Sequence, residues 1–164
     1  MQKAQHNSQS DVQASIEKFV ISELTREGYE FDIHPLEKPN FQLDIYAQYN
    51  GTTVIGEIYA GIDKLQPAQK KKVIADCFKL VYVEKYLSEK NPLKEIQKLM
   101  VFIDEIICNK FTKNEYRADS WVKDSLNLFY IKMKVIKISD LQKANLREAK
   151  KRQQIGMTIP TPKK

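Results

Sequence analysis

The chain of 164 residues has few of the residues on which many catalytic and metal-binding classes depend. It has two histidines and two cysteines, with no CxxC pair and no Cys/His spacing typical of a zinc site. A glycine-rich phosphate loop, a GxSxG elbow and an HExxH helix are also missing. The sequence therefore does not favour P-loop NTPases, α/β-hydrolases or zinc proteases. Cys77 and Cys108 are expected to be buried free thiols in a reducing cytoplasm.

Long apolar runs are missing as well. No stretch approaches the roughly 20 apolar residues that a membrane-spanning helix requires. Residues 1–13 are mostly polar and lack the apolar centre of a signal peptide. A hydrophobic content of 42% is ordinary for one globular domain. We therefore expect a cytoplasmic protein that does not contact the membrane.

Positive charge is concentrated at the C-terminus. From Leu141 onward, seven basic residues stand against one acid, Glu148, which accounts for the whole net charge of +6. Such a segment fits nucleic-acid binding and fits a solvated, partly disordered tail equally well. If it binds nucleic acid, the candidate contacts are Lys143, Arg147, Lys150, Lys151 and Arg152, together with Lys71 nearer the middle of the chain.

The stretch from Phe41 to Ala60 is predicted to form a β-hairpin. Asn50-Gly51 is a strong signal for a two-residue type I′ turn, which requires positive φ at both positions. With that turn, Asp44 stands directly opposite Glu57. Alternation puts Leu43 and the other odd positions of the first strand on a core face, and puts the two carboxylates together on the other face. Like charges in that arrangement destabilise a sheet unless a cation or a shared proton compensates.

The remaining elements are predicted from apolar periodicity and from capping residues. Helices are expected at 12–27, at 67–88, at 117–127 with Trp121, Val122 and Leu126 inward, and from the Ser139-Asp140 cap to 153. Further strands are expected at 29–34, 99–107 and 129–138, the last near a sheet edge. We divide the chain into a disordered N-terminus at 1–10, an α/β domain at 11–138 and a basic C-terminal helix and tail at 139–164.

This order of elements and the facing pair Asp44 and Glu57 resemble the PD-(D/E)XK nuclease superfamily, over roughly residues 11–138. In that family, an Asp in one strand and a Glu or Asp in the next bind Mg²⁺, and a Lys two residues after the second acid helps to activate water. Here Leu43 replaces the motif proline and Tyr59 replaces the motif lysine. The resemblance implies a restriction-endonuclease-like α/β core, with a mixed sheet of about five strands in the order αβββαβαβα.

The resemblance also implies a set of site residues. Asp44, Glu57 and the carbonyl of Ile58 would hold Mg²⁺ or Mn²⁺. In some members the lysine has moved to the following helix, and the candidates for this role are Lys64, Lys71 and Lys72. Gln69 and Lys72 begin a polar row on helix 67–88 that continues to Asp76 and Lys79, and the start of this row is expected near the carboxylates. The helix before the sheet often supplies another acid, for which Glu17 and Glu23 are candidates, although each also fits an ordinary exposed position.

Two functions stay open. The first is a Mg²⁺-dependent endonuclease, a hydrolase of phosphodiester bonds in DNA rather than RNA. The second is an inactive nuclease-like domain that binds nucleic acid or a protein partner. A weaker third alternative is purely structural, with Asp44 on a lysine and Glu57 on Tyr46 or Gln42. A homodimer is one option for its assembly. The discriminating observation is whether Asp44, Glu57 and a lysine converge.

Overall fold

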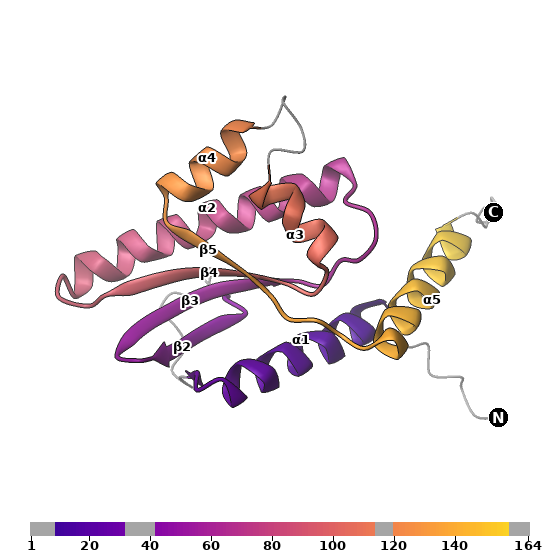
Figure 1. The fold of residues 1–164 in the computed structure, drawn as a ribbon, viewed down its shortest axis with the longest axis horizontal. Coiled ribbons are helices and arrows are strands. Elements are labelled where there is room, and N and C mark those ends of the chain that lie inside the picture. Colours follow the sequence, from indigo (N-terminus) through magenta and orange to yellow (C-terminus); the bar gives the residue numbers. More distant parts are fainter. Residues whose placement is uncertain (1–8, 32–41, 114–119, 158–164) are drawn as a thin grey trace, which may run out of the picture.

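The computed structural model describes residues 9–31, 42–113 and 120–157 (Figure 1). The N-terminus was predicted to be disordered at 1–10, but Gln9 and Ser10 already belong to the first helix, and residues 1–8 lie outside the described residues. The segment 158–164, predicted to be loose, and most of the loop before the hairpin also lie outside them. In the described part, the helices are α1 (Gln9–Arg26), α2 (Pro67–Lys90), α3 (Glu105–Thr112), α4 (Ser120–Leu128) and α5 (Asp140–Met157). The strands are β1 (Glu30–Phe31), β2 (Ile45–Tyr49), β3 (Thr52–Tyr59), β4 (Ile96–Phe102) and β5 (Ile131–Val135).

The strands form one mixed sheet in the order β1-β2-β3-β4-β5. β1, β2 and β3 pair antiparallel, whereas β3, β4 and β5 pair parallel. Helices cover both faces of this sheet (Figure 1). The chain is therefore an α/β protein with a five-stranded mixed sheet flanked by helices, as expected for a restriction-endonuclease-like core.

Two apolar layers hold the sheet between its helices. On one face, residues of α1 such as Val20 pack with Ile58 of β3 and with Leu146 of α5. On the other face, residues of α2, α3 and α4 pack with Tyr59 and Phe102. β3 is thus covered on both faces, and seven of its eight residues are buried. A polar side chain on this strand therefore costs free energy unless it finds a partner within the protein.

The hairpin has the predicted turn and register. Asn50 and Gly51 have φ values of 49° and 80°, as a type I′ turn requires. Tyr49 pairs with Thr52 and Ile45 pairs with Gly56. The predicted turn and register are therefore confirmed for Ile45–Tyr49, but β2 begins only at Ile45, so Asp44 lies just outside the paired residues.

The apolar run at 99–107 is not one strand, and this prediction was wrong. β4 ends at Phe102 and α3 begins at Glu105, because the Asp104 carboxylate accepts a hydrogen bond of 2.8 Å from the N–H of Ile106 and caps the helix. Both the end of β4 and Ile107 of α3 are buried, so the sequence is apolar on either side of the junction. Hydrophobicity alone could not show where the strand stopped and the helix began.

The other elements match their predictions with shifted ends. α1, α2 and α4 lie within a few residues of the predicted ranges, and Ser139 caps α5, since its hydroxyl accepts from the N–H of Gln142 at 3.2 Å. β5 is shorter than predicted and lies at the sheet edge, as expected. Trp121 was expected to face inward, but its side chain is 56% exposed, whereas Val122 and Leu126 are buried.

One further charged residue is enclosed by the fold. Lys98 in the central strand β4 is only 3% exposed, and its ammonium forms an ion pair with Glu84 of α2. Among the described residues, no helix is both long enough and apolar enough to cross a membrane.

Candidate active site at the β2–β3 hairpin

Asp44 occupies the position where the β2–β3 ladder would continue. Its Oδ2 accepts a hydrogen bond of 2.9 Å from the backbone N–H of Ile58. In the regular register, that N–H would meet the carbonyl of Leu43, so the carboxylate replaces a backbone group at the end of the ladder. The Asp44 carboxylate therefore lies at the edge of β3, beside the backbone.

The strand alternation predicted for residues 41–49 breaks at this point. Leu43 was expected on the same face as Ile45, but it packs with Ile55 and Leu80 on the face that α2 covers. The reason is that β2 begins only at Ile45, after a bend at Asp44. Local alternation holds only within a regular strand.

Glu57 is a carboxylate inside the second apolar layer. It is 4% exposed, and its Oε1 lies 2.6 Å from Nζ of Lys79, which projects from α2. The same ammonium donates a hydrogen bond of 3.0 Å to the backbone carbonyl of Gln42. Lys79 therefore joins the helix to the segment just before Asp44 and to the strand that carries Glu57. Glu57 was expected to meet Tyr46 or Gln42 in the structural alternative, but its ionic partner is this lysine.

The Glu57 carboxylate is held at an unusual acidity. Burial raises its pKa from 4.5 to about 7, and the nearby charge of Asp44 raises it as well. The hydrogen bond and the positive charge of Lys79 act in the opposite direction but do not cancel the effect of burial. In the absence of a metal ion, the folded protein therefore favours the protonated acid up to about pH 7.

This raised pKa predicts that the metal-free protein loses stability as the pH rises. The unfolded chain releases the Glu57 proton near pH 4.5, whereas the folded chain keeps it to about pH 7. The free energy of unfolding should therefore fall across this window, by an amount on the order of 3 kcal/mol at about 1.4 kcal/mol per pKa unit. Glu57→Gln should remove this part of the pH dependence and should be more stable than the wild type at pH 8.

Urea unfolding in EDTA at pH 5 and pH 8 measures the effect. Glu89→Gln is a matched control, because Glu89 is an exposed residue on α2. Equal pH dependence in the wild type and in Glu57→Gln would show that Glu57 is not the titrating group.

The cations proposed from the sequence are placed differently by the structure. Lys72 lies on the same row of α2 as Lys79, but its Nζ forms an ion pair of 2.8 Å with Asp76. Burial lowers the pKa of Lys72, yet the hydrogen bond and charge of Asp76, with the charges of Glu57 and Asp44, raise it overall. The charges of Glu57 and Asp44 therefore raise the pKa of Lys72, but the ammonium forms its ion pair with Asp76 and with neither of these two acids.

Gln69, Lys64 and Lys71 have other surroundings. The Gln69 side chain accepts a hydrogen bond of 2.9 Å from the N–H of Gln66 and so caps the start of α2. Lys64 lines a separate cavity near the start of α2 and α3. Lys71 is exposed on α2.

Tyr59 takes the place of the motif lysine and belongs to the apolar core. Its side chain is 6% exposed, its ring centroid lies 6.0 Å from that of Phe102, and burial raises its pKa to about 12. Its hydroxyl has no hydrogen-bond partner among the described residues. A Cβ at Gly61 would lie 2.3 Å from this ring, so only glycine fits there. Tyr59 therefore supplies packing rather than a positive charge.

The helix α1 brings a third acid to the edge of the site. Glu17 lines a hollow of about 330 Å³ together with Asp44, Ile58, Ala14, Lys18 and Ile21. Its Oε1 accepts a hydrogen bond of 3.0 Å from Gln13. Glu23, the other candidate, forms an ion pair with Arg26. Of the two acids considered from the sequence, Glu17 is the one that shares a hollow with Asp44.

The donor set suits one kind of metal ion. Asp44 and Glu57 supply two carboxylates, and a strand residue turns its N–H and C=O to the same side, which brings the Ile58 carbonyl to the Asp44 edge. Among the described residues, no three His, Cys, Asp or Glu side chains lie close enough together to hold a metal ion. Mg²⁺ needs only one or two carboxylates, with water and substrate oxygens as its other ligands, so the residues present fit it.

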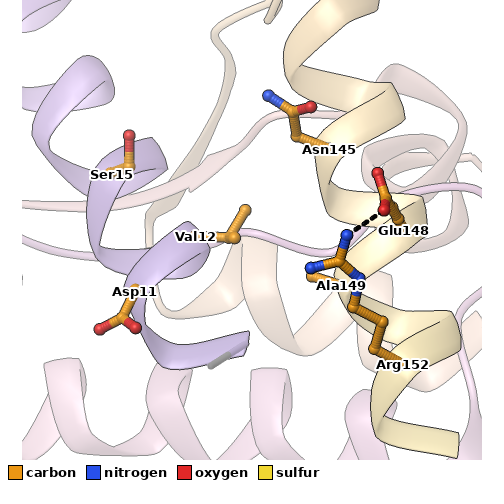
Figure 2. Close-up of a pocket in the computed structure, with 7 residues that line it drawn as sticks. All are labelled: Asp11, Val12, Ser15, Asn145, Glu148, Ala149 and Arg152. Atoms are coloured by element: carbon orange, nitrogen blue, oxygen red, sulfur yellow. Dashed lines mark hydrogen bonds and ion pairs between the residues drawn. The ribbon is translucent and has the colours of Figure 1, made fainter. Parts of the chain in front are cut away.

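The basic residues of α5 are partly engaged within the protein. Arg147 makes two hydrogen bonds of 2.8 and 3.0 Å to the Asp63 carboxylate, which lowers the pKa of Asp63, and Lys150 donates to the Ile62 carbonyl at 3.2 Å. Arg152 pairs with Glu148 beside a groove between α1 and α5 (Figure 2). Lys143 and Lys151 form no such ion pair within the described part of the chain.

Lys79 is the residue that sequence reasoning missed. It was recognised as the last member of the polar row on α2, but the start of that row was expected at the carboxylates. The signal was the spacing of the row, which places Lys72, Asp76 and Lys79 along one side of the helix. How far along the helix the row meets β3 depends on how α2 packs on the sheet, which the spacing does not contain.

Comparisons with known proteins give a similarity of fold. No family model matches the chain, and no curated protein matches it. Among solved structures, it is similar to an XisH family protein from Nostoc punctiforme, with a TM-score of 0.50 and 13% sequence identity. The match covers 74% of this chain and 90% of that one. At this identity the likeness concerns the fold and not the activity.

Proposed function

We propose that the chain is a metal-dependent nuclease-like domain that hydrolyses phosphodiester bonds of DNA. The observation that supports this proposal is that the buried Glu57 forms an ion pair of 2.6 Å with Lys79 and is also within reach of the charge of Asp44, whose carboxylate is bonded to the N–H of the next residue, Ile58. Two acids and an ammonium are the groups that the PD-(D/E)XK arrangement requires. Here the ammonium comes from α2, because the position after Ile58 is occupied by the buried Tyr59.

Each residue has a role that follows from its position. Asp44, Glu57 and the Ile58 carbonyl would hold Mg²⁺ or Mn²⁺, which when bound polarises a phosphoryl oxygen and makes water more acidic. Lys79 would stabilise the negative charge that develops on the phosphate. Glu17 and Lys18 line the hollow next to Asp44, where Glu17 can orient water and Lys18 can meet a phosphate.

A second candidate function also has an observation in its favour. The Lys79 ammonium already compensates the buried Glu57, so the acid pair does not need a metal for the domain to fold. A nuclease-like domain that binds nucleic acid or a protein without cleavage would have this arrangement. The two candidates differ in whether the acids bind a metal ion.

Thermal unfolding with and without metal tests the proposal. Millimolar Mn²⁺ should raise the melting temperature of the wild type by several degrees, since a ligand at about 100 times its Kd stabilises the folded state by about 2.7 kcal/mol. Asp44→Ala and Glu57→Ala should both remove this rise and abolish DNA cleavage. Asp124→Ala is the control, because Asp124 is an exposed acid on α4.

The outcomes separate the two candidates. A metal-induced rise together with Mg²⁺-dependent cleavage of DNA supports the enzyme. No rise and no cleavage of DNA would contradict it and favour the non-catalytic domain. Without metal, the Glu57→Ala variant should be no less stable than the wild type at pH 8, since it removes a buried carboxylate whose pKa is raised.

A further inference from the structure

Exposed hydrophobic side chains gather where α2 and α4 lie on the same face of the sheet (Figure 1). In the described part of the chain, more than half of the large hydrophobic residues that solvent reaches belong to α2, α4 or the turn after α4. Four of these residues, between 55% and 82% exposed, define what we call the α2–α4 surface: Phe78, Trp121, Leu128 and Tyr130. Packing within the domain does not account for their exposure.

The α2–α4 surface is contiguous. The Phe78 ring contacts the Phe129 ring, with centroids 6.4 Å apart, and this contact joins the middle of α2 to the end of α4. Leu128 and Tyr130 stand on either side of Phe129 in the chain. Phe78 and Trp121 also line the same narrow apolar cleft between the two helices. Single exposed hydrophobic residues are ordinary, whereas a contiguous group of them marks an interaction site.

The size of this surface suits a protein interface. A large aromatic side chain covers roughly 150–250 Å², so four large side chains that are each more than half exposed present about 500 Å² of apolar area. One side of a standard protein–protein interface covers about 800 Å², of which slightly more than half is apolar. The apolar area of the α2–α4 surface therefore matches one side of such an interface.

Charges of both signs border the surface. Lys71 and Lys85 stand seven residues before and seven residues after Phe78, on the same exposed row of α2. Asp124 lies one turn after Trp121, on the exposed row of α4. None of these three charged residues forms an ion pair within the described part of the chain. The surface therefore offers lysines on one helix and a carboxylate on the other.

We propose that the α2–α4 surface is the interface between two copies of this chain related by a two-fold axis. Both copies then use the same patch, with α4 of each copy on α2 of the other. Asp124 of one copy meets Lys71 or Lys85 of the partner subunit, and the reciprocal contact follows from the symmetry. The rings of Phe78 and Trp121 become buried at the centre, where aromatic residues contribute most. A second copy supplies cations and a carboxylate together, whereas a nucleic-acid strand supplies no cation for Asp124.

Sedimentation equilibrium of the full chain in EDTA tests the inference. The wild type should form a dimer with a Kd of about 1 μM or tighter, the affinity range of standard interfaces. Trp121→Ser and Phe78→Ser should each weaken the dimer at least about tenfold, because a two-fold interface loses the ring on both sides. Leu141→Ser is the matched control, since Leu141 is exposed on α5, which covers the opposite face of the sheet, and this variant should dimerise like the wild type.

A charge exchange tests the two-fold pairing itself. Asp124→Lys in one chain and Lys71→Glu/Lys85→Glu in another should each weaken their own homodimer, since like charges then face each other at both contacts. A mixture of the two variants should give a heterodimer at least about tenfold tighter than either homodimer, because both contacts again join opposite charges. All three positions are exposed, so the fold should tolerate these changes.

The metal site provides an independent readout. Neither Asp44 nor Glu57 belongs to the α2–α4 surface, so none of these variants should change the size of the metal-induced rise in melting temperature. A variant that weakens the dimer and leaves this rise intact separates the interface from the proposed nuclease activity.

The outcomes that would overturn the inference are specific. Trp121 is the only tryptophan of the sequence, so a blue shift of its fluorescence with increasing protein concentration should accompany dimer formation. A wild type that stays monomeric up to about 100 μM, or a dimer that both ring variants leave unchanged, would exclude this interface. Quenching of Trp121 in the monomer by a single-stranded oligonucleotide would then assign the surface to nucleic acid.

Discussion

Replacing Lys79 with methionine should lower metal-dependent DNA cleavage by about two to three orders of magnitude, the loss that follows removal of one group that stabilises transition-state charge. The metal-induced rise in melting temperature should remain, because Asp44, Glu57 and the Ile58 carbonyl are unchanged. Lys79 is the one α2 lysine whose ammonium contacts the Glu57 carboxylate in the described structure. The measurement pairs a cleavage assay with thermal unfolding in Mn²⁺.

Lys72→Met is the matched variant for this experiment. Lys72 lies two turns earlier on the same row of α2 and pairs with Asp76 instead of Glu57. We expect it to lower cleavage much less than Lys79→Met, and we expect Lys79→Arg to retain part of the activity because it keeps the charge. The reverse ranking, with Lys72→Met inactive and Lys79→Met active, would assign the role to Lys72, as the sequence first indicated.

The affinity for DNA should depend steeply on salt if α5 contacts phosphates. Each phosphate contact contributes about −0.9 to the slope of log K against log salt, so five contacts lower the affinity by more than about two orders of magnitude between 50 and 200 mM. Lys143→Gln/Lys151→Gln should reduce the slope by about 1.8 units. These two lysines are chosen because neither forms an ion pair within the described residues.

Deleting α5 would be a poor version of this test. Leu146 is buried in the first apolar layer, and Arg147 and Lys150 hold the loop at Ile62 and Asp63, so the deletion would disturb the fold as well as the charge. Lys85→Gln/Lys123→Gln removes the same charge from α2 and α4 and serves as the control. A slope that falls equally in both double variants would mean that α5 has no special part in binding.

The sequence predicted the hairpin well because its information is local. Asn50-Gly51 determines the turn, and the turn determines the register, which holds from the Tyr49–Thr52 pair to the Ile45–Gly56 pair. The position of Glu57 inside a core, and hence its raised pKa, followed from the helices that cover both faces of the sheet, not from the strand itself.

Features that depend on tertiary packing were predicted poorly. Lys79 meets Glu57 because of how α2 lies on β3, and the sequence spacing left the point of contact open. The Asp44 carboxylate ended the ladder by taking the N–H of Ile58, so the alternation failed one residue before β2. The boundary between β4 and α3 at Asp104 could not be predicted, because an acid inside an apolar run is compatible with a strand end as well as with a helix cap.

The enclosed lysine of β4 has a consequence for the fidelity of folding. β3 and β4 are buried on both faces, so their apolar residues by themselves would tolerate several alignments of the two strands. Lys98 pairs with Ile55 across the strands and reaches Glu84 on α2. A slip of β4 by one residue would turn this ammonium into the apolar layer beneath α1 and α5, where an unpaired charge costs several kcal/mol. One charged side chain thus makes a misaligned central strand too unstable to persist.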